Sequence, residues 1–159
     1  MTDTYAFRTP IGVLEIREKN DKIATIRIQQ KELGNFEVQH AKPHSDLLYE
    51  AYTQLNEYFA GKRMRFDLPL HYSGTPFQER VWNALREIPY GETRSYEDIA
   101  IAIGNKQAVR AVGQANNRNP ILIMVPCHRV IRKNGNIDGF TYGTEIKKYL
   151  LELEKGHFA

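Results

Sequence analysis

The chain has a single cysteine and no long apolar run. These two features argue against a disulfide-bonded protein, a cysteine-ligated zinc protein and a membrane-spanning protein. One thiol cannot close an internal disulfide, and alone it cannot supply the cysteine set of a structural zinc site. No apolar stretch approaches the roughly 20 residues that a membrane span needs. The first residues also lack the basic and apolar regions of a signal peptide. We therefore expect a cytoplasmic protein with no membrane association and no bound metal.

Acidic residues are missing from one long stretch of the second half. The 159 residues are 42% hydrophobic and 26% charged, which is typical of a globular protein. The net charge of +3 comes entirely from residues 71–159, because residues 1–70 hold ten basic and ten acidic side chains. Gly104 to Lys133 contain six basic residues and no acidic one. This pattern favours a polyanionic partner. The usual alternative is a solvated basic face, which the helical pattern described below makes less favoured.

The first part of the chain predicts strands followed by a helix. Three segments alternate imperfectly between apolar and polar residues: 5–9, 13–19 and 22–29. A helix is predicted over 46–59 and a further short strand over 66–70. His40 and His44 could be imagined as metal ligands, but no cysteine or carboxylate cluster joins them. We interpret both as surface residues.

A boundary near residue 71 divides this α+β region, residues 1–70, from a helical region, residues 71–159. Helices are predicted over 76–88, 96–103, 107–117 and 144–154. Thr75 and Ser95 are suitable N-caps for the first two of these helices. The second and third helices, joined by Gly104-Asn105, form a helix-turn-helix pattern, which is typical of DNA binding but weak evidence alone.

One side of the helix over 107–117 is nearly bare. Its small residues are Ala108, Ala111, Gly113 and Ala115, and the long cation Arg110 stands among them. Small side chains would let the helix lie close to a nucleic-acid groove that one arginine could enter. The alternative is that the alanines are good helix formers packed on the preceding helix.

The cysteine, Cys127, follows an apolar run and lies between Pro126 and the pair His128-Arg129. Cationic neighbours lower the pKa of a thiol, and the thiolate is the reactive form. This context favours a nucleophile, whereas an isolated cysteine is more often an inert core residue.

Six segments in this order closely resemble one family. They are Thr75-Pro76-Phe77-Gln78-Glu79-Arg80-Val81-Trp82, Ile88-Pro89-Tyr90-Gly91-Glu92-Thr93, Ser95-Tyr96, Ala108-Val109-Arg110-Ala111-Val112-Gly113, Asn119-Pro120 and Pro126-Cys127-His128-Arg129-Val130. The family is that of the O6-alkylguanine-DNA alkyltransferases, also called methylated-DNA–protein-cysteine methyltransferases. The resemblance is strong over residues 71–155 and looser over 1–70.

The resemblance implies an α+β protein in two parts. A small N-terminal domain similar to ribonuclease H would support a helical, winged-helix-like domain with the helix-turn-helix. The implied activity is DNA repair by irreversible, single-turnover transfer of an alkyl group, chiefly methyl, from O6 of guanine in double-stranded DNA. O4 of alkylated thymine is a second candidate source of the alkyl group. The family needs no cofactor and no protein partner, so a monomer is expected.

The resemblance also assigns roles to residues. Cys127 would attack the alkyl carbon, His128 would take the thiol proton through a bridging water, and Glu154 would orient the imidazole. Tyr96 would help to rotate the nucleotide out of the stack and donate a hydrogen bond to it. The remaining implied residues are Asn119, Val130, Phe140, Thr141 and Tyr142 for the substrate, and Arg110, Ala108, Ala111, Gly113 and Gln114 for DNA. We expect Arg129 to be a structural ion-pair partner.

The chain departs from the family pattern at Gly139 to Thr144. Phe140 keeps an aromatic wall but lacks a hydroxyl, and Tyr142 stands where the family usually has glycine. A ring at that position predicts a pocket that accepts methyl adducts well and benzyl adducts poorly, unless Tyr142 turns outward.

Three other functions compete with alkyl transfer. Alkyltransferase-like proteins bind the same lesions without reacting, but they carry another residue at the nucleophile position. A helix-turn-helix regulator has no use for a thiol beside His128. A cysteine hydrolase would need an oxyanion hole that the sequence does not indicate.

Overall fold

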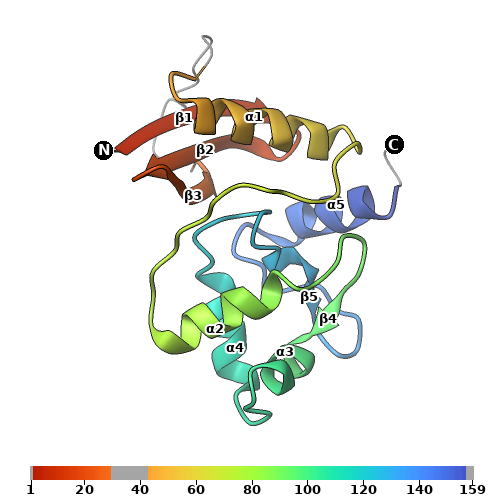
Figure 1. Cartoon of the computed structure of the whole chain (residues 1–159). Coiled ribbons are helices and arrows are strands. Elements are labelled where there is room, and N and C mark those ends of the chain that lie inside the picture. Colours follow the sequence, from red (N-terminus) through yellow and green to blue (C-terminus); the bar gives the residue numbers. More distant parts are fainter. Residues whose placement is uncertain (1, 30–42, 157–159) are drawn as a thin grey trace. The chain divides into compact units, whose positions relative to one another are not determined.

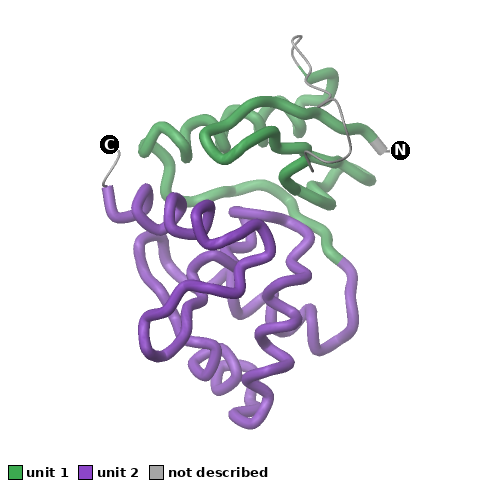
Figure 2. The backbone as a smooth tube through the Cα atoms, turned by 180° about the vertical axis from the view of Figure 1, so that it is seen from behind, with its two compact units in different colours: residues 1–72, 159 green, residues 73–158 purple. Residues whose placement is uncertain are grey.

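The structure is a computed structural model that describes residues 2–29 and 43–156. The chain forms two compact units, one up to Tyr72 and one from Ser73 onward, and Figure 2 colours them separately. His40 lies outside the described residues, and His44 is exposed. Within the described part of the chain, no helix is long and apolar enough to cross a bilayer.

In its described residues, 2–29 and 43–72, unit 1 is a three-stranded antiparallel sheet covered by one helix (Figure 1). Its elements are β1 (Thr2–Thr9), β2 (Gly12–Lys19), β3 (Lys22–Ile28) and α1 (Asp46–Phe59). Asn20 and Asp21 join β2 to β3 with φ angles of 52° and 64°. Two consecutive positive φ angles match the twist of a tight hairpin, and Asn and Asp tolerate them best. The sequence therefore determines this turn.

The helix α1 begins at a side-chain cap and packs on the sheet. Ser45 accepts a hydrogen bond from the Leu48 amide at 3.0 Å. The strand predicted over 66–70 is not formed. The structure has there only an isolated bridge between Ile23 and Leu70. Pro69 has no amide hydrogen to donate, so the segment cannot continue a regular ladder.

Unit 2, from Ser73 onward, is mainly helical and contains one small parallel sheet. Its elements are α2 (Pro76–Leu85), β4 (Arg94–Ser95), α3 (Tyr96–Ala102), α4 (Val109–Asn117), a 3₁₀ turn (Cys127–Arg129), β5 (Val130–Ile131) and α5 (Thr144–Glu154). Thr75 and Ser95 both form capping boxes, in which side chain and backbone bond reciprocally. The mixed α+β class predicted from the sequence is confirmed.

The helices α3 and α4 form the predicted helix-turn-helix, and α2 packs against both (Figure 1). The indole Nε1 of Trp82 on α2 donates to the Ala115 carbonyl on α4 at 2.9 Å. Helix α4 begins at Val109, two residues later than predicted, and Ala108 at its cap position makes no side-chain cap hydrogen bond.

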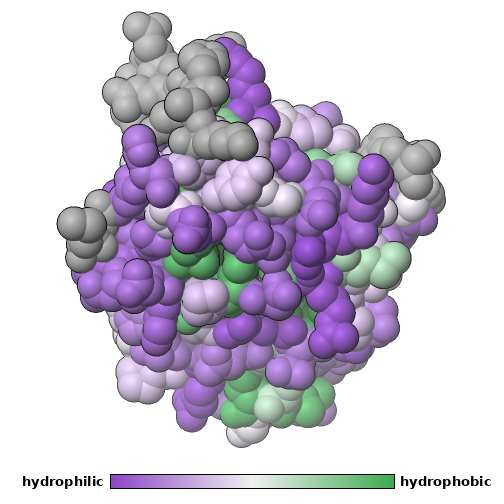
Figure 3. Space-filling view, turned by 45° about the horizontal axis from the view of Figure 1, so that its top comes forward, coloured by the Kyte–Doolittle hydropathy of each residue, from purple (hydrophilic) through white to green (hydrophobic). Residues whose placement is uncertain are grey.

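The surface is largely polar where it can be seen. The face in Figure 3 is mostly hydrophilic, with small apolar areas between the polar ones. Among the described residues, the large apolar side chains that are exposed are Tyr49, Met64, Ile101 and Val109. Scattered exposure of this kind needs no functional explanation.

Candidate active site

The apolar run before Cys127 forms a buried turn rather than a strand. Val125 donates its amide to the Ile121 carbonyl at 3.0 Å, and Cys127 donates to the Val125 carbonyl at 2.8 Å. Ile123 sits inside this turn with a φ of 74°, a left-handed conformation that a β-branched residue rarely adopts. Such strain costs on the order of 1–3 kcal/mol and persists where the surroundings enforce it. The chain before the cysteine is therefore held in one conformation.

Cys127 is buried and makes no disulfide. Burial raises the pKa of its thiol to about 11, although Asn119 and the charge of Lys147 act in the opposite direction. The lowered pKa expected from the neighbouring His128 and Arg129 is therefore wrong for the resting protein. Removal from water outweighs those neighbours, and the Arg129 charge is neutralised elsewhere.

His128 and Arg129 both bind the carboxylate of Glu154, which is at the end of α5. His128 Nε2 lies 2.6 Å from Glu154 Oε2, and Arg129 donates to both carboxylate oxygens at 2.8 and 3.1 Å. All three side chains are buried. Burial alone would raise the pKa of Glu154, but the bonds and charges of His128 and Arg129 hold it far below its usual range.

The neutral form of His128 is the stable one. Burial lowers the pKa of its imidazole below the ordinary value, against the opposing effect of Glu154. Because ionised Glu154 can only accept, the proton of neutral His128 belongs on Nε2. The other nitrogen, Nδ1, is buried and has no hydrogen-bond partner among the described residues. It is thus a base with a free acceptor position.

Arg129 also makes contacts with the segment that follows α2. It donates to the Ile88 carbonyl at 2.6 Å, and its guanidinium lies 5.8 Å from the centre of the Tyr90 ring. The Gly91 amide donates to Glu154 at 3.2 Å. The expectation that Arg129 is a structural ion-pair partner is confirmed.

The strand β4 brings Tyr96 to the site. Arg94 pairs with Val130 and Ser95 with Ile131, in parallel, so α3 starts beside the segment that follows the cysteine. The ring of Tyr96 is half-buried, and its carbons lie 3.8 Å from the place that a Cβ on Gly113 would take. Tyr96 therefore lies between α4 and Val130, and burial raises the pKa of its hydroxyl.

Lys147 is one of two residues of the site, with Asn116, that the sequence did not identify. Its side chain is fully buried, and its Nζ donates to the Val130 carbonyl at 2.6 Å. The ammonium lies 6.0 Å from the ring centre of Tyr96 and 5.9 Å from that of Phe140. Burial lowers its pKa to about 8. A signal existed, because Lys147 falls in line with Leu150, Leu151 and Glu154 on the buried face of α5.

Two asparagines at the end of α4 hold the cysteine segment. Asn119 donates to the Val125 carbonyl at 2.6 Å and accepts from the Ile121 amide at 2.9 Å. Asn116 donates to the Cys127 carbonyl at 3.3 Å, and the same carbonyl accepts from the Val130 amide. Both acceptor positions of the Cys127 carbonyl are thereby occupied.

The loop before α5 carries the three predicted pocket residues. Phe140 is buried, Thr141 is exposed and Tyr142 is half-buried. Tyr142 packs edge-on against Phe140, with ring centres 6.0 Å apart at 61°, so it does not simply point into solvent. Thr141 donates its hydroxyl to the Asn117 carbonyl at 2.7 Å, which ties this loop to α4.

The predicted DNA-binding residues lie on α4 and just before it. Arg110 and Gln114 are exposed, whereas Ala108, Ala111 and Gly113 are half-buried. Among the described residues, Arg110 makes no ion pair or hydrogen bond. Lys106 and Arg118 also lack a salt bridge to any described carboxylate. The helix thus presents unneutralised positive charge to a partner.

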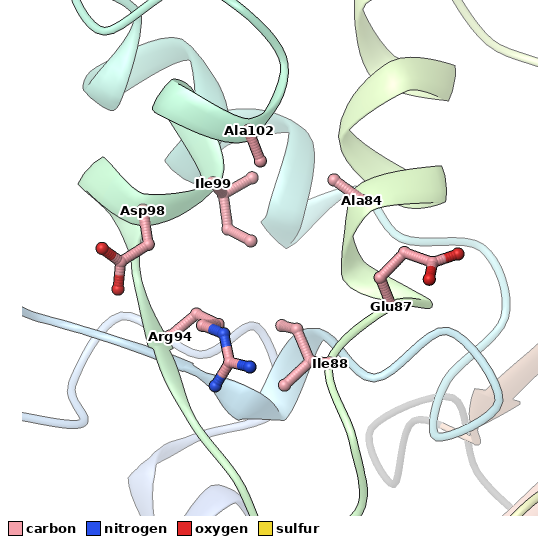
Figure 4. A pocket seen from close by; sticks show the side chains of 7 residues that line it. All are labelled: Ala84, Glu87, Ile88, Arg94, Asp98, Ile99 and Ala102. Carbon is pink, nitrogen blue, oxygen red and sulfur yellow. The ribbon is translucent and has the colours of Figure 1, made fainter.

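A hollow of about 510 Å³ lies between α2 and α3, and Figure 4 shows its lining side chains. The lining residues are Ala84, Glu87, Ile88, Arg94, Asp98, Ile99 and Ala102. Two of these residues also adjoin the cysteine segment: Ile88, whose carbonyl accepts a hydrogen bond from Arg129, and Arg94, which pairs with Val130. In residues 2–29 and 43–156 no group of three His, Cys, Asp or Glu side chains is placed to hold a metal ion.

Comparison with known proteins agrees with this geometry. Residues 76–156 match the family described as 6-O-methylguanine DNA methyltransferase, DNA binding domain, and residues 3–72 match its ribonuclease-like domain. The constitutive methylated-DNA–protein-cysteine methyltransferase of Bacillus subtilis is 51% identical over 152 residues, which is 92% of each chain. The Methanosarcina acetivorans methyltransferase is 48% identical over 149 residues, covering 93% of this chain and 95% of that one.

Solved structures give the same result. The crystal structure of Mycobacterium tuberculosis O6-methylguanine methyltransferase superposes with a TM-score of 0.85 at 42% identity, covering 100% of this chain and 96% of that one. The M. tuberculosis OGT in complex with DNA gives 0.84 at 45%, covering 96% and 92%. This chain therefore belongs to the family of methylated-DNA–protein-cysteine methyltransferases.

Proposed function

We propose that this protein repairs DNA by moving an alkyl group, chiefly methyl, from O6 of guanine to the sulfur of Cys127. The observation that carries the proposal is a buried, unpaired thiol followed directly by a histidine whose imidazole is oriented by a buried carboxylate. Membership of the family and the DNA complex of a relative support DNA as the partner. The non-reacting, alkyltransferase-like alternative is not favoured, because this chain keeps the cysteine.

The chemistry follows from the protonation states. The Cys127 thiol, neutral at rest, gives its proton to Nδ1 of His128 through a bridging water. The sulfur then forms a bond to the alkyl carbon while the bond from that carbon to O6 breaks, and the electron pair stays on the purine. The hydrogen bond from Tyr96 stabilises the negative charge on the departing purine. The purine then takes up one proton from solvent and becomes guanine, and His128 returns the thiol proton to solvent. The thioether is stable, so each molecule reacts once.

DNA binding would use α4. Arg110 and Gln114 on this helix are exposed. The side chains of Ala108, Ala111 and Gly113 are small, so the helix could approach a DNA groove closely. Arg110 would fill the space left by the nucleotide that rotates out, since its planar cation can stack and hydrogen-bond together. The acid-free stretch around this helix would attract the phosphate backbone.

The pocket for the extruded base would lie between Tyr96 and the loop of Phe140, Thr141 and Tyr142. The Val130 carbonyl accepts one hydrogen bond from Lys147 and has a second acceptor position for the guanine amino group. Asn119 would hold the segment before Cys127 in a fixed position relative to α4. Such a single-use protein needs no partner subunit, and we infer a monomer working in the reducing cytoplasm, where one free thiol stays reduced.

Intact-protein mass spectrometry tests the proposal. After incubation with a duplex containing O6-methylguanine, the protein should gain the mass of one methyl group, and peptide mapping should place it on Cys127. Cys127→Ser and Cys127→Ala should gain nothing and should leave the lesion in the duplex. An unmodified wild-type thiol beside a persisting lesion would disprove the proposed transfer.

A further inference from the structure

The end of α4 is tied to the nucleophile through one buried side chain. Asn116 is 2% exposed, and its amide nitrogen donates to the carbonyl of Cys127 at 3.3 Å. Helix α4 is therefore bonded to the reacting residue itself, in addition to the contact that Asn119 makes with the preceding segment.

The orientation of the Asn116 amide is fixed by its partner. A peptide carbonyl can only accept, so the amide nitrogen and not its oxygen must face Cys127. In this orientation the Asn116 oxygen is buried and has no hydrogen-bond partner among the described residues. A leucine has the same branched arrangement of side-chain heavy atoms and would occupy this position without burying an unpaired acceptor. Packing alone therefore does not explain an asparagine here.

The opposite face of the same helix is the one available to a partner. Arg110, Gln114 and Asn117 are exposed, whereas Val112, Ala115 and Asn116 are buried. A short helix moves as a rigid element, so a displacement or a restraint applied to its exposed face reaches the buried face. Asn116 is the polar contact through which that restraint acts on Cys127.

We propose that Asn116 is a positioning residue that couples the binding of α4 to DNA with the placement of the Cys127 backbone. This inference rests on the proposed function, in which α4 binds DNA. When α4 is held in a groove, the Asn116 bond holds the cysteine carbonyl, and with it the sulfur, in the geometry for attack. Without DNA the same bond is present, but nothing holds the exposed face of α4, so a free base gains little from it.

The coupling predicts a split between two substrates. Asn116→Leu removes the donor and keeps the branched shape of the side chain. Asn116→Asp is closer in size but places an acceptor opposite the Cys127 carbonyl, which is itself an acceptor. With O6-methylguanine in a duplex, the single-turnover rate of methyl transfer should fall by about fivefold to tenfold, the worth of one hydrogen bond. With O6-methylguanine supplied as the free base, the rate of each variant should stay within about twofold of the wild-type rate. A difference of that size is typical of a substitution without a functional effect.

The DNA affinity and the folding of both Asn116 variants are measured together with these transfer rates. The dissociation constant for the duplex, at fixed salt, should not change, because the exposed face of α4 is intact. The free-base rate serves as the control for a distorted site, because a misfolded or loosened Cys127 would slow both reactions. Equal losses with both substrates, or no loss with either, would overturn the coupling. If the wild-type protein gained no methyl group at all, the proposed function would fail, and this inference would fail with it.

Discussion

His128 Nε2 and Glu154 Oε2 lie 2.6 Å apart in the interior of unit 2, and the same carboxylate binds Arg129 through both of its oxygens. One acid thus orients the imidazole and neutralises a buried guanidinium. Because the acid stays ionised, it fixes which nitrogen of His128 carries the proton and leaves Nδ1 as the base.

Replacing Glu154 by glutamine should therefore cost both stability and activity. The change leaves Arg129 buried without a counter-charge, and losses of about 3–5 kcal/mol are typical when one partner of a buried pair is removed. Urea denaturation measures this loss, and single-turnover methyl transfer should slow because the imidazole is no longer held in one tautomer. Glu152→Gln, on the same helix but outside the buried group, is the control and should stay within about 0.5 kcal/mol. Similar losses in the two variants would contradict the role of the pair.

The rate of transfer should depend little on pH around neutrality. A free cysteine becomes more reactive as pH rises through about 8.5, its ordinary pKa. Here the pKa of Cys127 is raised to about 11 by burial, so its proton must leave through neutral His128. Since the pKa of His128 is lowered, the rate should decline only below the usual histidine range. Single-turnover rates measured across pH test this expectation.

The matching variant is His128→Gln. Without the base, the rate should be low at neutral pH and should climb steadily toward pH 11, where the thiol ionises directly. A wild-type profile that rises through pH 8.5 like that of a free thiol would show that His128 does not take the proton.

Lys147→Met should change the pH dependence of stability. The pKa of Lys147 is about 8 in the folded protein, against an ordinary value of 10.5. Above pH 8 the unfolded chain therefore binds more protons at this residue than the folded one, and stability rises with pH. Cys127 has the opposite effect at higher pH, because burial raises its pKa from the ordinary range to about 11. The wild type should thus gain about 1 kcal/mol from pH 8 to 9, and the methionine variant should not.

Activity provides a second measurement for Lys147. Its charge is one of the influences that favour the Cys127 thiolate, so the methionine variant should transfer methyl more slowly. Lys148→Met is the matched control, since Lys148 is the exposed neighbour on the same helix. If both variants behaved like the wild type in urea denaturation and in transfer, the buried ammonium would have no part in either.

Gly113→Ala should stabilise the fold and weaken DNA binding. A Cβ at this position meets only the Tyr96 ring at 3.8 Å, an ordinary contact, so the methyl group fits. Alanine is favoured over glycine inside a helix by about 0.5–1 kcal/mol. The same methyl group would keep α4 from approaching a groove closely, and fluorescence anisotropy at fixed salt would record the loss of affinity. Unchanged affinity would place Gly113 outside the DNA interface.

Tyr142→Ala should widen the range of adducts that the pocket accepts. The Tyr142 ring packs against Phe140, in the loop that would surround the alkyl group in the proposed pocket. We expect the inactivation rate with O6-benzylguanine to rise by about tenfold, while the rate with O6-methylguanine changes little. Tyr142→Phe keeps the ring and should behave as the wild type. Equal, fast rates of the unmodified protein with both adducts would refute the restriction.

The parts of the fold that the sequence predicts well are those with local signals. The bounds of α1 and α5 agree with the prediction because an apolar stripe marks each helix, and Ser45 caps α1. The hairpin at Asn20-Asp21 agrees because those residue types tolerate its backbone angles. The segment 66–70 was wrongly predicted as a strand because three alternating apolar residues say nothing about whether a ladder partner is available.

The candidate site was predictable only in part, because most of its contacts are not local. Cys127 and His128 are adjacent in the chain, but Glu154 lies 26 residues from His128 and was assigned by resemblance alone. The raised pKa of the thiol depends on how completely the fold excludes water, which no neighbouring residue type reveals. Lys147 and Asn116 looked like ordinary helix residues until the structure showed that both are buried beside Val130 and Cys127.

Trp82 gives the molecule a spectroscopic property of its own. It is the sole tryptophan of the chain, and its indole is hydrogen-bonded to the Ala115 carbonyl on α4. Tryptophan emission therefore originates at the contact between α2 and α4 and is sensitive to any rotation of α4. An unlabelled sample can in this way report helix movement in real time, through its intrinsic fluorescence.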